Sequence, residues 1–220
     1  MVIKAVIFDL NGTLIDDSEI INEAWRSAAG SIGIRLPVDF DFIRRGLTSS
    51  DIITKILKVT NAEEMYALLK RRSYEINKNI DRSLLFPDVI PALDKLKQKH
   101  KNIAIASSME PNLIERLLEL TGLKSYVDGV ASSKEVKNGK PAPDVFLLAA
   151  DRLGLGPGEC MAVGDSPNDI LAGKAAGMIS IFLSRKNEKF EGAYTNIKSM
   201  EELVENGIGD LLFRQAPDSD

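Results

Sequence analysis

The sequence predicts an α/β protein whose core is a doubly wound parallel sheet, with an all-helical cap inserted after the first strand. Three observations support this fold class. Residues 2–8 form an almost unbroken apolar run, which is typical of a strand buried on both faces of a parallel sheet. Between Ile15 and about Arg82 no strand-like run occurs, and apolar residues recur at helical spacing. From Leu84 onward, strand-like and helix-like segments alternate, as they do in doubly wound sheets.

The helical block begins with an acidic cluster, Asp16-Asp17-Ser18-Glu19, which suits the N-terminus of a helix. The helical spacing that follows fades near Gly33, and Pro37 then breaks the chain. Further helical patterns cover residues 42–45, 52–59 and 65–80. We therefore expect a helical cap over residues 16–81 and a core built from residues 1–15 and 82–220, joined by two hinges.

The remaining elements of the core follow from the alternating pattern. We expect strands at residues 102–106, 127–131, 160–164 and 178–183. We expect helices at about residues 88–99, 113–121, 166–176, 144–153 and 200–212, the second of them ending at Gly122. Residues 214–220 read as a loose polar tail.

The bulk composition argues against several functional classes. With 44% hydrophobic and 27% charged residues, the chain has the composition of an ordinary globular protein. Its formal charge of −4 offers no basic surface for nucleic acid. No apolar run approaches the roughly 20 residues needed to cross a bilayer, and the apolar stretch at the start ends at Asp9 rather than in a signal-peptide pattern. We expect neither nucleic acid nor a membrane as partner.

Cysteine and histidine are each represented by one residue. Cys160 cannot form an intramolecular disulfide, which favours a reducing compartment and a cytoplasmic location, and its apolar context predicts a buried thiol. His100 lies in a Lys-rich stretch. A histidine-based triad or a zinc site therefore has almost no residues to draw on.

Polar residues follow three of the predicted strands: Asp9, Ser107-Ser108 and Asp165. The carboxyl ends of parallel strands meet at one edge of the sheet, where α/β proteins bind their ligands. Lys140, in a Gly-Lys-Pro loop, could supply a cation there. Two close carboxylates repel each other unless a cation or a proton lies between them. Mg²⁺ takes hard oxygen ligands and leaves positions for water and phosphate, so we expect Mg²⁺ at this edge.

Four segments resemble, in order and spacing, the four motifs of the haloacid dehalogenase superfamily. They are Asp9-Leu10-Asn11-Gly12-Thr13-Leu14, Ser107, Lys140-Pro141 and Gly164-Asp165-Ser166-Pro167-Asn168-Asp169. The helical insert resembles the small cap of the phosphoglucomutase-like and phosphoglycolate-phosphatase-like branch. The resemblance covers almost the whole chain except the tail, and it implies a Rossmann-like core.

The resemblance implies a role for each matching residue. Asp9 matches the nucleophile, which attacks phosphorus and forms an aspartyl-phosphate. Asp165 matches the Mg²⁺-ligating carboxylate, and the superfamily completes the metal site with the nucleophile and with the backbone carbonyl at the position of Asn11. Lys140 matches the cation that neutralises the phosphoryl oxygens and the nucleophile. This chemistry is phosphoryl transfer by positioning and charge stabilisation.

The resemblance also implies the substrate contacts. Ser107 matches the phosphate-binding hydroxyl, with Ser108 beside it, and the superfamily uses the position of Thr13 near the phosphate. The cap supplies specificity in this branch, so the loop at residues 44–50 is the expected contact, and Arg45 could bind a second anionic group of the substrate.

Three of these residues keep an alternative interpretation. Ser107 and Ser108 could instead cap the next helix. Asp169 lies three residues after Ser166, with Pro167 between them, and fits the carboxylate of a capping box as well as it fits a second carboxylate of the metal site.

Asn11 departs from the superfamily pattern. Phosphatases and mutases usually carry a second Asp here, which protonates the leaving group and later activates water. A neutral amide does neither, and loss of a positioned acid/base typically costs roughly 10²–10⁴-fold in rate. Three explanations stay open. They are a deliberate Asp→Asn replacement that traps substrate or intermediate, a slow natural phosphatase, and different chemistry, because the dehalogenases and phosphonatases also lack this Asp.

Other residues argue for or against the alternative reactions. Mutases of this branch carry a His where this chain has Ile21 and an Arg where it has Ser49, which weakens a phosphoglucomutase-like phosphotransferase. Asp165 and Lys140 favour phosphate over halide, because dehalogenation needs no Mg²⁺. A phosphonatase would need a cap lysine in a recognisable motif. A non-catalytic member that binds a phosphorylated metabolite is the remaining alternative.

The sequence and its resemblance together predict a Mg²⁺-dependent phosphatase. Its substrate would be a small phosphomonoester, a sugar phosphate or a related metabolite, hydrolysed through an aspartyl-phosphate on Asp9. The identity of the substrate and the oligomeric state stay open at this stage.

Overall fold

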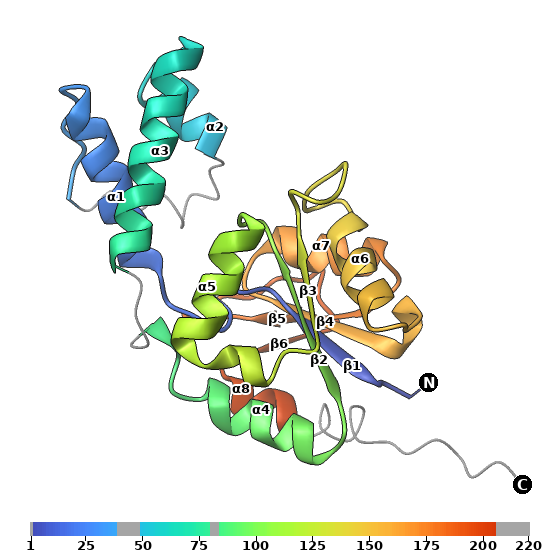
Figure 1. Ribbon diagram of the computed structural model, residues 1–220. Coiled ribbons are helices and arrows are strands. Elements are labelled where there is room, and N and C mark those ends of the chain that lie inside the picture. The colour runs from blue at the N-terminus through green and yellow to red at the C-terminus, as the bar shows by residue number, and fades with distance from the viewer. Residues whose placement is uncertain (1, 39–48, 80–83, 206–220) are drawn as a thin grey trace, which may run out of the picture. The chain divides into compact units, whose positions relative to one another are not determined.

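The computed structural model describes residues 2–38, 49–79 and 84–205. The chain divides into two compact units, one formed by Met1–Asp16 with Leu85–Asp220 and the other by Asp17–Leu84 (Figure 1). Among the described helices, none is both long enough and apolar enough to cross a membrane.

The larger unit is built on one parallel sheet. Within the described ranges its six strands are β1 (Ala5–Phe8), β2 (Asn102–Ser107), β3 (Gly129–Ser132), β4 (Cys160–Gly164), β5 (Ile179–Leu183) and β6 (Thr195–Ile197). Their order is β3-β2-β1-β4-β5-β6, and every neighbouring pair is parallel. The predicted fold class is confirmed. Strand β6 was not predicted, because three residues with one buried side chain leave no readable apolar run.

Strand β1 lies at the centre of the sheet and is buried along its whole length. Its last residue, Phe8, is in register with Ile105 of β2 on one side and with Val163 of β4 on the other. The strand order reverses between β1 and β4, so their carboxyl ends form the topological switch point, where doubly wound sheets bind ligands. Asp9 and Asp165 follow these two strands directly.

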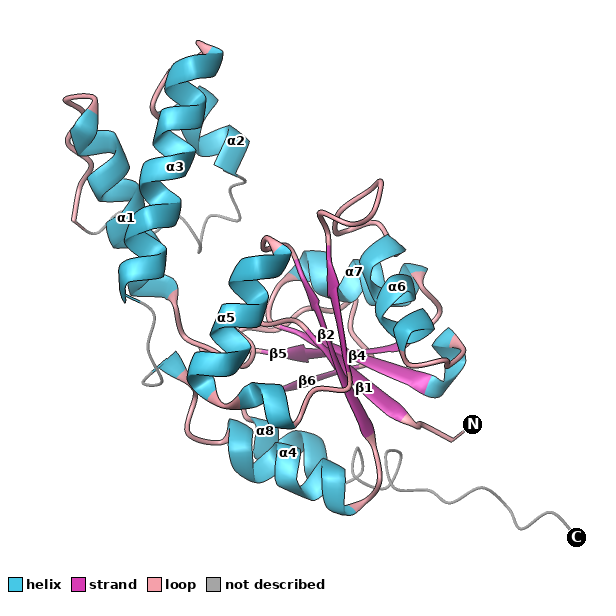
Figure 2. Cartoon of the chain, viewed as in Figure 1, coloured by secondary structure: helices cyan, strands magenta, loops and turns pink. Residues whose placement is uncertain are grey.

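Helices cover both faces of the sheet (Figure 2). Helices α6 (Asp144–Arg152) and α7 (Pro167–Ala175) cover one face, and α4 (Val89–Gln98), α5 (Pro111–Thr121) and α8 (Met200–Val204) lie on the other. On the α6 face, Ile7 belongs to the same apolar cluster as Phe146 and Cys160. The predicted burial of Cys160 is confirmed, and burial raises the pKa of its thiol to about 11.

One predicted helix is shorter than expected. Helix α8 begins after Ser199, whose Oγ accepts a hydrogen bond from the amide of Glu202, but it ends at Val204 instead of near residue 212. Glu205 already has an extended backbone, and the dipeptide that follows it, Asn206-Gly207, is typical of turns. Residues 206–220, including the predicted tail, lie outside the described ranges.

The secondary-structure elements described in the smaller unit are all helical. It contains α1 (Ser18–Ser31), α2 (Ser49–Asp51), a π-helical turn (Ile52–Ile56) and α3 (Ala62–Asn79). Helices α1 and α3 pack through a cluster that includes Trp25 and Leu68. Helix α3 begins earlier than its apolar pattern because the Asn61 side chain accepts hydrogen bonds from the first free amides. The helix predicted at residues 42–45 lies outside the described residues.

Candidate active site

A tight turn follows β1 and carries the first motif. The Asp9 amide still donates to the Val163 carbonyl of β4, at 2.8 Å, after which residues 10–15 turn back on themselves. The amides of Leu14 and Ile15 donate to the Leu10 carbonyl, and the Gly12 amide donates to the Ile15 carbonyl at 2.7 Å. Backbone hydrogen bonds therefore hold the turn closed.

Gly12 is required at its position for two reasons. Its φ of +77° lies in the left-handed region that side chains disfavour. A Cβ atom there would also lie 2.1 Å from Oδ2 of Asp165. The missing side chain thus allows the turn after β1 to contact the carboxylate that follows β4.

The second carboxylate segment is organised by the start of α7. Ser166 is the N-cap, Pro167 the first helical residue, and Asp169 the partner in a reciprocal capping box. Oδ2 of Asp169 accepts hydrogen bonds from the amide and the hydroxyl of Ser166. Gly164 allows this close approach, because a Cβ there would lie 2.3 Å from the Cβ of Asp169. The capping interpretation of Asp169 is confirmed, but its other oxygen, Oδ1, faces the site.

Lys140 connects these segments. Its Nζ atom lies 2.6 Å from Oδ1 of Asp9 and 2.6 Å from Oδ1 of Asp169. It also donates to the main-chain carbonyl of Ala106, at the end of β2, at 2.7 Å. An ammonium group has three protons, so these partners use its full donor capacity. With its side chain only 5% exposed, Lys140 is a fixed, buried cation at this edge of the sheet.

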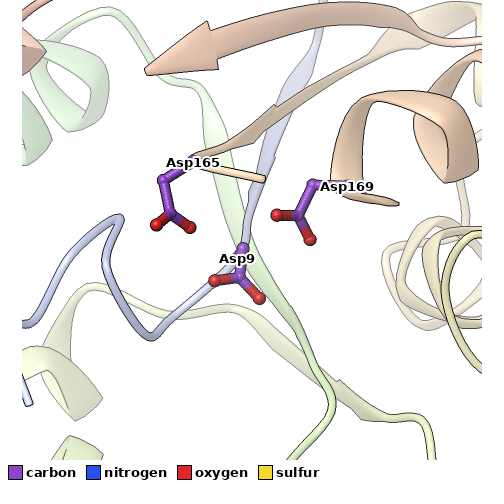
Figure 3. Close-up of side chains that lie close together, drawn as sticks. All are labelled: Asp9, Asp165 and Asp169. Atoms are coloured by element: carbon purple, nitrogen blue, oxygen red, sulfur yellow. The ribbon is translucent and has the colours of Figure 1, made fainter. Parts of the chain in front are cut away.

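Three carboxylates lie close together at this site, and two of them contact the Lys140 ammonium group. The side chains of Asp9, Asp165 and Asp169 point toward one another (Figure 3), and each offers an oxygen within 4.8 Å of the others. Burial raises the pKa of Asp9 to about 7, although Lys140 opposes the shift while Asp169 adds to it. Burial, Asp9 and Asp169 likewise raise the pKa of Asp165 well above its ordinary range.

The charge balance of this cluster fits a divalent cation. Burial lowers the pKa of Lys140, but its two carboxylate partners outweigh burial and hold the pKa above its usual value. The ammonium therefore stays charged, but it can offset only one negative charge, and the raised pKa values of Asp9 and Asp165 show that the three carboxylates repel one another when ionised. A hard divalent cation bound by the carboxylate oxygens would remove the remaining repulsion.

The other predicted site residues are placed differently. Thr13 is fully buried, and its Oγ1 donates to Oδ1 of Asp165 at 3.3 Å. Ser107 is buried at the end of β2, where its Oγ accepts from the Met109 amide at 3.2 Å, whereas Ser108 is exposed. Neither serine caps α5, which begins at Pro111 with Glu110 at its N-cap. Arg45 lies outside the described residues.

Two features of the site were missed or left undecided by sequence reasoning. The Ala106 carbonyl, which holds Lys140, belongs to the backbone and leaves no signal in residue type. Asp169 fitted two roles equally, and the structure shows that its two oxygens point to two different partners. The capping-box spacing after a strand-ending Asp was the signal that places Asp169 beside the site.

The buried carboxylates predict an unusual pH dependence of stability in metal-free protein. The pKa of Asp9 rises from 3.8 to about 7 on folding, so the folded state binds the proton more tightly. The free energy of unfolding should therefore fall as pH rises from about 4 to about 7. In EDTA at pH 8, Asp9→Asn should be more stable than the parent by roughly 4 kcal/mol. Urea unfolding at pH 4 and pH 8 measures the difference, which should nearly vanish at pH 4. An equal difference at both pH values would contradict this prediction.

Comparison with known proteins gives a consistent answer. A profile of the haloacid dehalogenase-like hydrolases matches residues 3–177. The chain is 32% identical over 181 residues to the fructose-1-phosphate phosphatase YqaB of Escherichia coli (strain K12), covering 80% of this chain and 94% of that protein. It is also 32% identical to the β-phosphoglucomutase of Bacillus subtilis (strain 168), covering 81% and 82%. A β-phosphoglucomutase structure from Clostridium difficile shares the fold, with a TM-score of 0.80 at 24% identity over 96% of this chain and 97% of that one. This chain belongs to the haloacid dehalogenase-like hydrolase family.

Proposed function

We propose that this protein is a Mg²⁺-dependent phosphatase that hydrolyses a small phosphomonoester, a sugar phosphate or a related metabolite. The observation that carries the proposal is the buried Lys140 bridging Asp9 and Asp169 beside Asp165. Such a set of charges suits a doubly charged phosphate ester, whose oxygens need cations and whose phosphorus needs a nucleophile. The similarity to a sugar phosphatase and to a sugar phosphomutase supports the substrate class.

In this mechanism Asp9 is the nucleophile. One of its carboxylate oxygens forms a bond to phosphorus while the ester bond to the alcohol breaks, and water later cleaves the aspartyl-phosphate to release phosphate. Lys140 holds Oδ1 of Asp9, which orients the carboxylate and neutralises charge that develops on the phosphoryl oxygens. Ser107 and Ser108, at the end of the neighbouring strand, would bind the phosphate.

Mg²⁺ would be held by Asp9, Asp165 and the backbone carbonyl of Asn11, and it would supply charge neutralisation for the phosphoryl group. Asp169 acts through Lys140, because its Oδ1 fixes the ammonium group while its Oδ2 is held by the N-cap of α7. Thr13 acts through Asp165, whose Oδ1 accepts its hydroxyl hydrogen bond.

Asn11 sets the expected rate. Its amide cannot donate a proton to the departing alcohol or remove one from the attacking water, so both steps should be slow. The contribution of Arg45 to substrate binding remains a prediction. Phosphotransfer between sugar phosphates is a second candidate, favoured by the similarity to a mutase but weakened by Ile21 and Ser49.

Phosphate release from a panel of phosphomonoesters tests the proposal. The panel should include fructose 1-phosphate and phosphoglycolate, because two related phosphatases are named after these compounds. We expect slow release with Mg²⁺ and none with EDTA, restored when Mg²⁺ is added in excess. Binding of a phosphomonoester without any release by the parent or by Asn11→Asp would instead favour the non-catalytic alternative. Interconversion of two sugar phosphates without net release of phosphate would favour the mutase.

A further inference from the structure

Arg185, two residues beyond the end of β5, binds three groups at once. Its Nη1 lies 3.0 Å from Oδ2 of Asp88, and its Nη2 donates to the main-chain carbonyl of Thr13 at 3.1 Å. The guanidinium also lies over the Phe86 ring, 3.7 Å from its centroid. The side chains of Arg185 and Asp88 are only 17% and 13% exposed, so this ion pair is largely shielded from solvent.

The Thr13 carbonyl belongs to the turn that carries the first motif. The Thr13 hydroxyl donates to Asp165, and Gly12 lies against the same carboxylate. Arg185 therefore holds the backbone of a residue whose side chain contacts a proposed metal ligand. Thr13 thus connects the guanidinium to the acidic cluster. Its carbonyl accepts a hydrogen bond from Arg185, and its hydroxyl donates one to Asp165.

The same arginine ties this turn to the segment that precedes α4. The Phe86 amide donates to the Leu14 carbonyl at 3.2 Å, beside the contact of Arg185 with Thr13. Oδ2 of Asp88 also accepts from the Met200 amide, at 2.9 Å, at the start of α8. Arg185 thus fixes the turn against two other parts of the same unit. The planar guanidinium suits this role, because its two terminal nitrogens can donate to Asp88 and to the Thr13 carbonyl at the same time.

Stability alone is a poor explanation for this pair. Among the described residues, Nε of Arg185 and Oδ1 of Asp88 are buried without a hydrogen-bond partner. Unsatisfied buried polar atoms cost free energy, and a buried ion pair is weak evidence for stabilisation. The two atoms that are satisfied on Arg185 are those that orient the turn and Asp88.

We propose that Arg185 is a positioning residue for the active site, which holds the turn at residues 10–15 so that its groups meet Asp165. The effect on turnover rests on the proposed function, whereas the effect on the turn itself does not. Loss of Arg185 should loosen the turn, weaken Mg²⁺ binding and lower kcat, with little change in the KM for the phosphate ester. Partners that orient metal ligands typically contribute about 10- to 100-fold to metal affinity or activity.

The chain offers a matched control in Arg152. This arginine also donates to a main-chain carbonyl, that of Val130, and pairs with a carboxylate, that of Glu135. It does so on the edge strand β3, which β2 separates from β1. Replacing either arginine by Lys or Met therefore removes the same kind of fork, and of the two only Arg185 contacts the turn.

The experiment compares Arg185→Lys and Arg185→Met with Arg152→Lys and Arg152→Met. The first measurement is hydrogen exchange of the Gly12, Leu14 and Ile15 amides in EDTA, because these amides close the turn. The second is calorimetric titration with Mg²⁺. The third is kcat and KM. We expect both Arg185 variants to show faster exchange of these amides and Mg²⁺ affinity and kcat about 10- to 100-fold lower. The Arg152 variants should match the parent, and Arg185→Lys should be less impaired than Arg185→Met because it keeps a cation for Asp88.

If the Arg185 variants lose thermal stability but keep parental exchange in the turn, parental Mg²⁺ affinity and parental kcat, the role of Arg185 is only structural and the proposal is overturned. A parent that releases no phosphate from any ester would remove the proposed function but leave this test intact. Exchange and Mg²⁺ titration need no substrate, and they decide the positioning role by themselves.

Discussion

Replacing Asp9 by Asn is expected to lower the rate of phosphate release by at least about 10⁴-fold, as removal of a nucleophile does in other enzymes. An amide oxygen is a poor nucleophile toward phosphorus, and the substitution also removes one of the carboxylates proposed to bind Mg²⁺. The fold should persist, because Lys140 keeps its contacts with Asp169 and the Ala106 carbonyl. Steady-state phosphate release with excess Mg²⁺ measures the effect.

Asp151→Asn is the matched control, because Asp151 is exposed on α6 in the same unit. It makes the same chemical change and should leave the rate unchanged. Mass spectrometry of acid-quenched protein should detect a phosphorylated form of the parent that Asp9→Asn does not form. Phosphate on the Asp9→Asn protein, or turnover by it near the parental rate, would show that another residue attacks phosphorus.

Replacing Asn11 by Asp is expected to raise the rate of phosphate release by roughly 10²–10⁴-fold, the usual contribution of a positioned acid/base. The new carboxyl group would lie in the turn after β1 and would protonate the departing alcohol. It would then remove a proton from the water that cleaves the aspartyl-phosphate. The gain should be larger for alkyl phosphates than for p-nitrophenyl phosphate, whose leaving group needs no proton.

A burst experiment separates the two steps. With p-nitrophenyl phosphate, the parent should release nitrophenol rapidly up to one equivalent and then slowly, because the aspartyl-phosphate hydrolyses without a general base. Asn11→Asp should remove the burst by accelerating the second step. Asn61→Asp is the control, since Asn61 caps α3 and Asp caps a helix equally well. An unchanged rate in Asn11→Asp would favour chemistry that does not use this acid/base.

The sequence allowed the sheet, the helical insert and the convergence of Asp9, Asp165 and Lys140 to be predicted, because each leaves a local signal. Buried parallel strands are continuous apolar runs, and their ends mark the ligand edge of the sheet. Strand β6 and the end of α8 were not predicted correctly, because a three-residue edge strand has no period and the Asn206-Gly207 turn signal follows a helical pattern.

The site also depends on contacts that residue types do not encode. The Ala106 carbonyl holds Lys140, and the Thr13 carbonyl is held by Arg185, far along the chain. Both are backbone atoms whose partners are determined by the tertiary fold. Thr13 was predicted to lie near the phosphate, and in the structure its hydroxyl contacts Asp165. Short-range patterns therefore locate the carboxylates but not the network that orients them.

The turn after β1 has a consequence for how such an enzyme can evolve. It is closed by hydrogen bonds between backbone atoms and by a glycine with positive φ. The proposed metal contact of Asn11 likewise uses its carbonyl. Asn and Asp codons differ by a single base, so one point mutation would change the side chain and preserve the loop. On the proposed mechanism, a lineage would thereby change its turnover rate in one genetic step, in either direction, without rebuilding the protein.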